Sequence, residues 1–203
     1  MDTKHGQIDL LLVTGPSTGG KTSTLEMVFA QRSQFASVVT TTSRPPRTRR
    51  DGTGLMEING VDYTFRKPEE IIEMDKRHEF FEVNRFTGDY LYGTEKSALQ
   101  KIWDLHKIPA LNVDINGAKA FRAHFPNALI ISVMPRTMEE LETRMRASGM
   151  SEASMVKRLQ QAKEDMPLYG SCCNAALYAG TGEVEKLVTC ILYLIDGHFA
   201  LKT

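Results

Sequence analysis

The sequence predicts an α/β fold in which helices cover both faces of a parallel sheet. Two observations support this fold: short apolar runs alternate with segments of helical periodicity, and a glycine-rich turn follows the first run. A third observation, the break in this alternation at 37–96, predicts an insertion between two core elements. At 203 residues, the chain is expected to form a single domain with a smaller inserted part.

The first half of the chain carries two predicted core strands. Residues 8–14 are apolar and β-branched, as in a buried strand. A helix after the turn is indicated by apolar residues at helical spacing, namely Leu25, Val28 and Phe29. An amphipathic helix further on is marked by Leu99, Ile102 and Trp103. It leads into a second predicted strand at 108–114.

The second half is expected to continue the alternation. Thr137 and Glu140 have the Thr-x-x-Glu spacing of a capping box, which predicts a helix from there to about Gly149. The other predicted elements, in chain order, are a helix at 118–123, a strand at 128–134, a helix at 152–163, a strand at 175–178 and a helix at 183–195. Within the insertion, aromatic segments at 63–65 and 80–92 look like short strands.

Composition excludes several classes of function. Lys plus Arg and Asp plus Glu both number 25, so no global field draws the chain to nucleic acid or to an anionic membrane. The longest apolar runs, at 10–13 and 128–133, are far shorter than the ~18 residues of a membrane span. No secretion signal is recognised. The three cysteines have no metal-ligand spacing and are expected to be reduced thiols of a cytoplasmic protein.

A glycine-rich stretch between the first strand and the first helix fits the pattern Gly-x4-Gly-Lys-Ser/Thr. It consists of Gly15, Pro16, Ser17, Thr18, Gly19, Gly20, Lys21 and Thr22. Glycines let backbone N–H groups approach phosphate oxygens, and the following helix adds the positive end of its dipole. Lys21 would neutralise β- and γ-phosphate charge, and the Thr22 hydroxyl would ligate Mg²⁺. A plain glycine turn is the alternative, but the strand and helix on either side favour a phosphate loop.

Two further segments carry candidate charge chemistry. The strand at 110–114 can deliver the Asp114 carboxylate to the phosphate site, although many strands end in Asp. Residues 44–50 bring four arginines together in an otherwise neutral chain. A solvated loop and a nucleic-acid patch are possible readings of the arginines. The stiffening prolines and the hydroxyls at 40–43 favour a compact phosphate monoester instead.

Five segments together resemble guanylate kinases in order and spacing: residues 15–17, 42–47, 60–65, 79–82 and 92–94. The likeness runs from about residue 8 to about residue 164. It implies a P-loop NTPase core at 1–36, 97–135 and 161–203, a GMP-binding insertion at 37–96 and a mobile helical lid at 136–160. It also implies ATP as co-substrate, GMP as acceptor and Mg²⁺ as cofactor.

The resemblance implies a role for individual side chains of this chain. It places Arg44, Arg47 and Tyr63 on the phosphate of GMP. It places Thr40, Glu82 and Thr94 around the base of GMP. Tyr92 joins Tyr63, with Tyr90 as a competitor because one extra residue precedes it, and Asp114 is counted with the GMP-binding residues. The side chains expected to act in catalysis are Lys21, Arg44 and the lid arginines Arg144 and Arg158.

Glu82 has a physical logic of its own. Guanine offers hydrogen-bond donors at N1 and N2, which one carboxylate can accept together, whereas adenine has an acceptor at N1. A buried carboxylate would lose its partners with the wrong base, so such a site discriminates strongly.

Four departures from the family pattern stand out. The stretch 47–62 is several residues longer than usual, and Asn112 replaces one of two aspartates. Ser148 replaces a further lid arginine, for which Arg146 is a possible substitute. The Asn-Asp pair expected near adenine is replaced by Ala179-Gly180-Thr181. The leading hypothesis is an ATP-dependent guanylate kinase; the alternatives are a guanylate-kinase-like interaction domain and a kinase for another phosphorylated small molecule.

Overall fold

The structure, a computed structural model, describes residues 8–49, 52–85 and 90–200. Its contacts divide the chain into two compact units, one of which is Ser37–Lys107 and the other the remainder. The inserted unit therefore includes residues 97–107, which the sequence analysis assigns to the core. Helix α3 (Lys96–Asp104) contacts strand β6 (Leu91–Glu95) of the same unit, which explains the difference.

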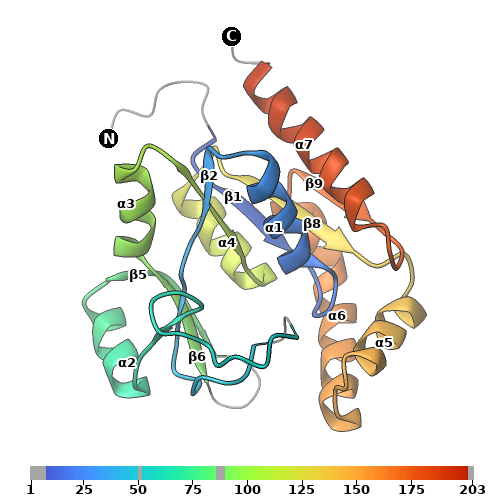
Figure 1. The fold of residues 1–203 in the computed structure, drawn as a ribbon, viewed down its shortest axis with the longest axis horizontal. Coiled ribbons are helices and arrows are strands. Elements are labelled where there is room, and N and C mark those ends of the chain that lie inside the picture. The colour runs from blue at the N-terminus through green and yellow to red at the C-terminus, as the bar shows by residue number, and fades with distance from the viewer. Residues whose placement is uncertain (1–7, 50–51, 86–89, 201–203) are drawn as a thin grey trace. The chain divides into compact units, whose positions relative to one another are not determined.

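A five-stranded sheet forms the centre of the larger unit (Figure 1). In order across the sheet its strands are β2 (Phe35–Ser37), β7 (Ile108–Asn112), β1 (Leu11–Thr14), β8 (Leu129–Met134) and β9 (Ala175–Tyr178). β1 pairs in parallel with both β7 and β8, and β8 pairs in parallel with β9. The predicted parallel sheet is confirmed, with β2 as a short strand that the sequence analysis does not predict.

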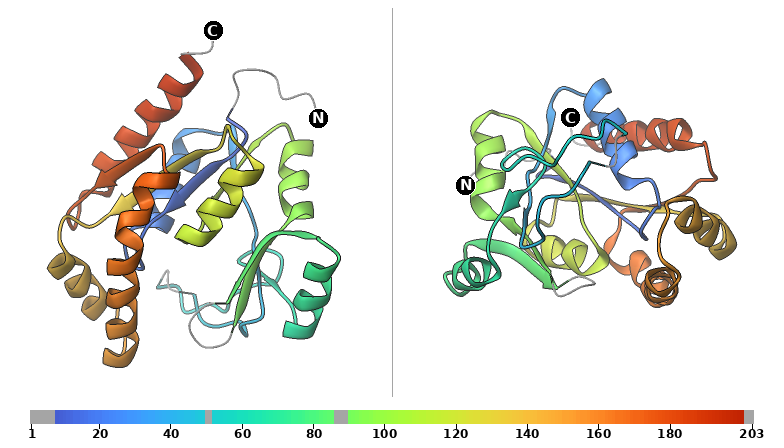
Figure 2. Two further views of the ribbon diagram at one scale, coloured as in Figure 1. Left: turned by 180° about the vertical axis from the view of Figure 1, so that it is seen from behind. Right: turned by 60° about the horizontal axis from the view of Figure 1, so that its bottom comes forward.

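Helices cover both faces of this sheet. On one face α1 (Lys21–Gln31) packs against α7 (Val184–Ala200), and on the other α4 (Ile115–His124) packs against α6 (Glu152–Cys172), as Figures 1 and 2 show. The core between sheet and helices is apolar, and Leu11, Val13, Val28, Ile131 and Ile191 are fully buried in it. Because β7 and β8 flank β1 on opposite sides, the carboxyl end of β1 lies at the switch point where open α/β sheets bind ligands.

Helix α5 (Met138–Ala147) begins where the capping motif predicts. The Thr137 Oγ1 accepts a hydrogen bond from the Glu140 backbone N–H at 3.2 Å. The Glu140 carboxylate does not return to Thr137; it accepts from the backbone N–H of Arg136 at 3.2 Å. α5 and α6 share a small core built from Leu141, Met145, Met155 and Ala162.

Helix α6 is longer than the predicted helix at 152–163. It continues through Pro167 to Cys172, and so crosses residue 160, where the sequence analysis ends the lid. The buried positions Met155, Ala162, Tyr169 and Cys172 recur at helical spacing, so one apolar stripe runs along its whole length. The expected lid and the core are therefore joined by one continuous helix.

The inserted unit is built on a four-stranded sheet in the order β4 (Thr64–Phe65), β3 (Thr41–Thr42), β6 and β5 (Phe80–Arg85). β3 is parallel to β4 and antiparallel to β6, which is antiparallel to β5. Helix α2 (Pro68–Lys76) was not predicted, although Pro68 and the glutamates of its first turn are helix-start signals. Its apolar side packs with β5 and β6 through Ile71, Met74, Phe80 and Leu91.

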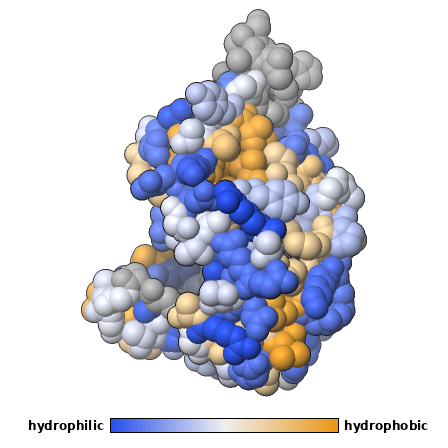
Figure 3. Space-filling model, turned by 90° about the vertical axis from the view of Figure 1, so that its right-hand side faces the viewer, coloured by the Kyte–Doolittle hydropathy of each residue, from blue (hydrophilic) through white to orange (hydrophobic). Residues whose placement is uncertain are grey.

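In the part of the chain that the structure describes, no helix combines the length and the apolar character needed to cross a membrane. Figure 3 shows the side of the molecule with α5 and α7, where hydrophilic residues dominate and apolar residues form small patches. Among the residues of β9 and α7 whose exposure is described, Tyr178 and Tyr193 are exposed large apolar side chains.

Candidate active site

The glycine-rich loop of the larger unit has the backbone that a phosphate site requires. Gly15 has φ of 135°, and a Cβ there would collide with the carbonyl oxygen of Val133 on β8. Gly20, with φ of 93°, is the N-cap of α1, and no described side chain caps this helix. The first N–H groups of α1 are thus available to an anion. They lie at the N-terminal end of the helix, where the helix dipole favours negative charge.

Lys21 lies in this loop with its ammonium group on backbone carbonyls. Its Nζ donates to the carbonyl oxygens of Gly15 and Pro16, both at 2.8 Å. Burial and the positive charge of Arg158 lower the pKa of Lys21 to about 8, against a smaller opposing effect of Asp114. The lowered pKa reflects the cost of keeping a buried ammonium group charged close to a second cation.

Arg158 is brought to the same loop from α6. Its guanidinium donates to the Ser17 hydroxyl oxygen at 2.8 Å. The structure therefore places one of the two predicted lid arginines directly on the predicted ATP-binding loop. Two cations, Arg158 and Lys21, therefore lie on the same loop, an arrangement that favours binding of a polyanion.

Thr22 at the start of α1 and Asn112 at the end of β7 together fit a magnesium ion. The Asn112 Nδ2 donates to the Thr22 Oγ1 at 3.2 Å. The Asn112 Oδ1 is buried and has no hydrogen-bond partner among the described residues. Magnesium prefers oxygen ligands and retains several waters, so a hydroxyl and an unpaired amide oxygen suit it. Among the described residues there is no cluster of three or more His, Cys, Asp or Glu that could hold a metal ion.

Asp114 follows β7 and starts the next helix. It is the N-cap of α4, and its Oδ1 accepts from the Gly117 backbone N–H at 2.7 Å. Burial raises the pKa of this carboxyl, assisted by the charge of Asp165 and opposed by the hydrogen bond from Gly117. Asp114 thus belongs to the larger unit, and its predicted part in GMP binding stays a prediction.

Arg144 is held on the loop that replaces the expected Asn-Asp pair. Its guanidinium donates to the Ala179 carbonyl oxygen at 2.7 Å and to Glu140 Oε1 at 2.8 Å. The same Glu140 oxygen accepts from the Thr181 backbone N–H at 2.6 Å. Glu140 therefore links α5 to this loop through one carboxylate.

The other lid candidates have local roles in the structure. Arg146 pairs with Glu142 at 2.8 Å and with Glu152 at 3.1 Å on an exposed surface. The Ser148 hydroxyl donates to the Met145 carbonyl oxygen at 2.7 Å, and Gly149 follows with φ of 71°. These two residues terminate α5 as the sequence predicts.

In the inserted unit, three polar side chains meet on β5 and β6. Glu82 accepts from the Thr94 hydroxyl at 2.8 Å and from the Asn84 amide at 2.7 Å, one on each carboxylate oxygen. Glu82 and Thr94 are direct partners across the strand pair. The structure thus brings two of the predicted base-binding residues together and adds Asn84, which alternation along β5 could have indicated. Thr40 lies just before β3, and its carbonyl oxygen accepts from Thr64.

Arg44, Tyr63 and Tyr92 form a second group in this unit. The Arg44 guanidinium lies 5.4 Å from the centre of the Tyr63 ring, and the Tyr63 and Tyr92 rings are 6.3 Å apart. Burial opposes the charged form of Arg44, but bonds with Glu57 and Tyr92 outweigh it and raise the pKa of Arg44. The structure thus groups Tyr92 with Arg44 and Tyr63, while Tyr90 is exposed, and the role of Tyr92 on the phosphate stays a prediction.

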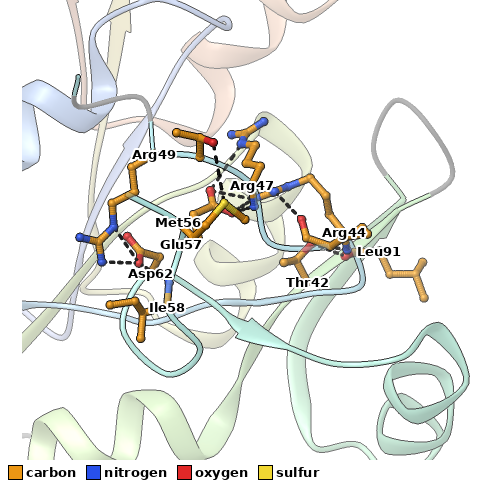
Figure 4. Close-up of polar contacts among 11 residues, drawn as sticks. Thr42, Arg44, Arg47, Arg49, Met56, Glu57, Ile58, Asp62 and Leu91 are labelled. Carbon is orange, nitrogen blue, oxygen red and sulfur yellow. Dashed lines mark hydrogen bonds and ion pairs between the residues drawn. The ribbon is translucent and has the colours of Figure 1, made fainter. Parts of the chain in front are cut away.

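Glu57 is a site residue that the sequence analysis did not single out. Its carboxylate accepts from Arg44 at 2.8 and 3.0 Å and from the backbone N–H of Arg47 at 3.1 Å (Figure 4). The Arg47 side chain adds an ion pair at 3.4 Å. The only signal for Glu57 in the sequence is its place in the unusually long stretch 47–62, close to the arginines at 44–50.

Comparisons with known proteins agree with one another. A family model described as guanylate kinase matches residues 7–174. A guanylate kinase of Nostoc sp. is 35% identical over 158 residues, which are 77% of this chain and 75% of that protein. One of Desulfitobacterium hafniense is 32% identical over 167 residues, or 82% of this chain and 78% of that protein.

Among solved structures, the guanylate kinase of Anaplasma phagocytophilum has a TM-score of 0.68 at 23% identity, over 95% of this chain and 86% of that chain. That likeness shows the fold. With a family model over most of the chain and relatives above 30% identity, the chain belongs to the guanylate kinase family.

Proposed function

We propose that the chain transfers the γ-phosphoryl group of ATP to GMP and releases ADP and GDP. The observation that carries this is the complete phosphate loop, with Lys21 and the uncapped start of α1 in the larger unit. A phosphate oxygen of GMP forms a bond to the γ-phosphorus of ATP, and the bond from that phosphorus to the β–γ bridging oxygen breaks. Catalysis of this reaction is chiefly positioning and charge stabilisation.

The donor side is formed by the loop 15–22. Its backbone N–H groups bind the phosphates, and Lys21 exchanges its two carbonyl partners for β- and γ-phosphate oxygens. Thr22, with Asn112 behind it, would hold Mg²⁺, which when bound neutralises charge on the triphosphate. Arg158 already bonds Ser17 of this loop, and Arg144 reaches the transferring phosphoryl group after leaving Ala179.

The acceptor side is formed by the inserted unit. Arg44, Arg47, Tyr63 and Tyr92 bind the phosphate of GMP, while Glu82, Thr94 and Thr40 surround its base. Thr94 and Asn84 each occupy one oxygen of Glu82 and so fix the plane of its carboxylate. A fixed anionic acceptor pairs with N1–H and N2–H of guanine and repels N1 of adenine.

A coupled assay with ATP and Mg²⁺ tests this function on four acceptors: AMP, GMP, CMP and UMP. We expect GMP to be phosphorylated far faster than the other three. Faster turnover of AMP would contradict the role of Glu82, and no turnover with any acceptor would favour an interaction domain. We further propose a cytoplasmic location, since Cys172, Cys173 and Cys190 are free thiols in the structure.

A further inference from the structure

We propose that Glu140 and Glu183 occupy the N–H groups of the loop 179–181, beside which the base of the phosphoryl donor lies, so that the site accepts nucleoside triphosphates whatever their base. The inference deepens the proposed function, because it names the class of donor, and it rests on that function. All of its contacts lie within the larger unit.

The loop 179–181 follows β9, at the edge of the sheet that carries the phosphate loop. Strands β7, β1, β8 and β9 are neighbours and run in parallel, so their carboxyl ends share this edge. Thr22 and Asn112, which would hold Mg²⁺ against the β- and γ-phosphates, lie on the β7 side of β1. The α-phosphate, ribose and base therefore extend to the other side, over the ends of β8 and β9. Figure 1 shows the loop after β9 beside α5.

Every N–H group of this loop has an acceptor. The Gly180 N–H donates to Glu183 Oε2 at 2.7 Å, and the Thr181 N–H donates to Glu140 Oε1 at 2.6 Å. The Thr181 hydroxyl donates to the same Glu140 oxygen at 3.2 Å. The Ala179 N–H is bonded within the sheet, to the last carbonyl of β8 at 3.1 Å. Within these three described residues, no N–H is left for a base while both carboxylates stay in place.

Further contacts hold Glu183 in its position. Its carboxylate also accepts from Arg136 at 2.5 Å and from Lys186 at 2.8 Å. The hydrogen bond from Lys186, assisted by that from Gly180, lowers the pKa of Glu183 to about 2, so this acceptor is ionised at neutral pH. A Cβ at position 180 would lie 3.1 Å from Glu183 Oε2, closer than ordinary contact. The carboxylate thus fills the space that a side chain at this position would need for contacting a base.

Hydrogen-bond acceptors alone do not distinguish the bases. Arg144 leaves the Ala179 carbonyl in the proposed reaction, so this oxygen can accept from a base. Every base has an N–H to donate: adenine and cytosine from the amino group, guanine from N1 and N2, and uracil from N3. Selection needs a donor beside the acceptor, because adenine and cytosine present an amino group next to a ring acceptor, whereas guanine and uracil present a ring N–H next to a carbonyl. The two glutamates remove the donor from this pattern.

The test measures kcat/KM for ATP, GTP, CTP and UTP with Mg²⁺ and radiolabelled GMP, and follows labelled GDP, which reports transfer from any donor. We expect the four values of the native protein to agree within about five-fold, because the phosphate contacts are common to all donors. Glu183→Ala releases the Gly180 N–H beside the Ala179 carbonyl. It should separate ATP and CTP from GTP and UTP by a further factor of about five or more, the worth of one net hydrogen bond.

Two control variants keep the Gly180 N–H bonded. Lys186→Ala removes a partner of the same carboxylate whose side chain is 77% exposed, and Glu183→Gln keeps an acceptor oxygen. Both should give the native ratios among the four donors. Circular dichroism checks the fold of each variant, and the native values alone decide whether the base is read.

Two results would overturn the inference. A native preference for one donor well beyond about five-fold would show that the site reads the base. Unchanged donor ratios in folded Glu183→Ala would show that the carboxylates do not control this reading. If no donor phosphorylates GMP, the proposed function itself fails, whereas transfer from ATP alone leaves that function intact and refutes only this inference.

Discussion

The pKa of Lys21 makes ATP binding depend on pH in a range where ATP itself does not titrate. With a pKa of about 8, against 10.5 for an ordinary lysine, Lys21 loses its proton around pH 8 in the free protein. The cause is burial together with Arg158, and both are countered when a triphosphate supplies negative charge. ATP should therefore bind to the protonated form and raise the pKa of Lys21.

The magnitude follows from the pKa of about 8. At pH 7 roughly 90% of Lys21 is protonated and at pH 9 roughly 10%, so ATP affinity should fall about ten-fold over this range. The triphosphate is almost fully ionised above about pH 7, so it contributes little. The free energy of unfolding changes with pH in the opposite direction to ATP affinity. Between about pH 8 and 10.5 the unfolded chain binds more protons at Lys21 than the folded one does, so the free protein gains stability from this group as pH rises.

Calorimetric titration with ATP at pH 7, 8 and 9, in buffers of different ionisation enthalpy, measures both affinity and proton uptake. We expect uptake approaching one proton per ATP at pH 9. The uptake should vanish in Lys21→Met and persist in Lys76→Met, which removes a lysine that is 69% exposed. Equal affinity at pH 7 and 9 with no proton uptake would refute the assignment of this pKa to Lys21.

Three further predictions concern the division of labour in the site. Lys21→Ala should abolish turnover and leave GMP affinity within about two-fold by calorimetry, because its contacts lie in the donor loop; loss of both would show that the sites are not separate. Glu82→Gln should lower the ratio of GMP to AMP turnover by at least about ten-fold, because an amide offers one acceptor end; an unchanged ratio would place base recognition elsewhere. Arg144→Ala should lower turnover by about a hundred-fold or more in steady-state kinetics with little change in the GMP Michaelis constant; the reverse pattern would assign Arg144 to ground-state binding.

The core was predictable because its local signals agree. Apolar runs at β1, β7 and β8 coincide with turn residues at their ends, and the capping pattern at Thr137 gives the start of α5. Helix α2 is not predicted because it has few apolar residues and its glutamates are equally typical of an exposed loop. The extension of α6 was missed because Pro167 looks like a helix end, whereas packing on both sides of it keeps the helix continuous.

The site was predictable where a motif carries its own geometry. The loop 15–22 and the strand pair of Glu82 and Thr94 follow from spacing, since a turn and a strand register fix which side chains meet. Glu57 could not be found in this way, because its distance from Arg44 depends on the pairing of residues 55–57 with 47–49, which sequence spacing does not predict. The contact of Glu140 with Thr181 spans about forty residues of sequence and depends on tertiary packing in the same way.

The cations of the predicted site already have acceptors in the free protein. Lys21 bonds two carbonyls, Arg158 a hydroxyl, Arg144 a carbonyl and Glu140, and Arg44 a carboxylate. An incoming phosphate thus replaces neutral carbonyl acceptors at Lys21 but meets a carboxylate beside Arg44 and Arg144. Replacing a carbonyl by an anion strengthens a charged hydrogen bond, whereas competition with a carboxylate gives little net gain. The donor loop should therefore supply most of the charge attraction for ATP. Where a carboxylate stays in place, its contribution is the orientation of an arginine rather than affinity for charge.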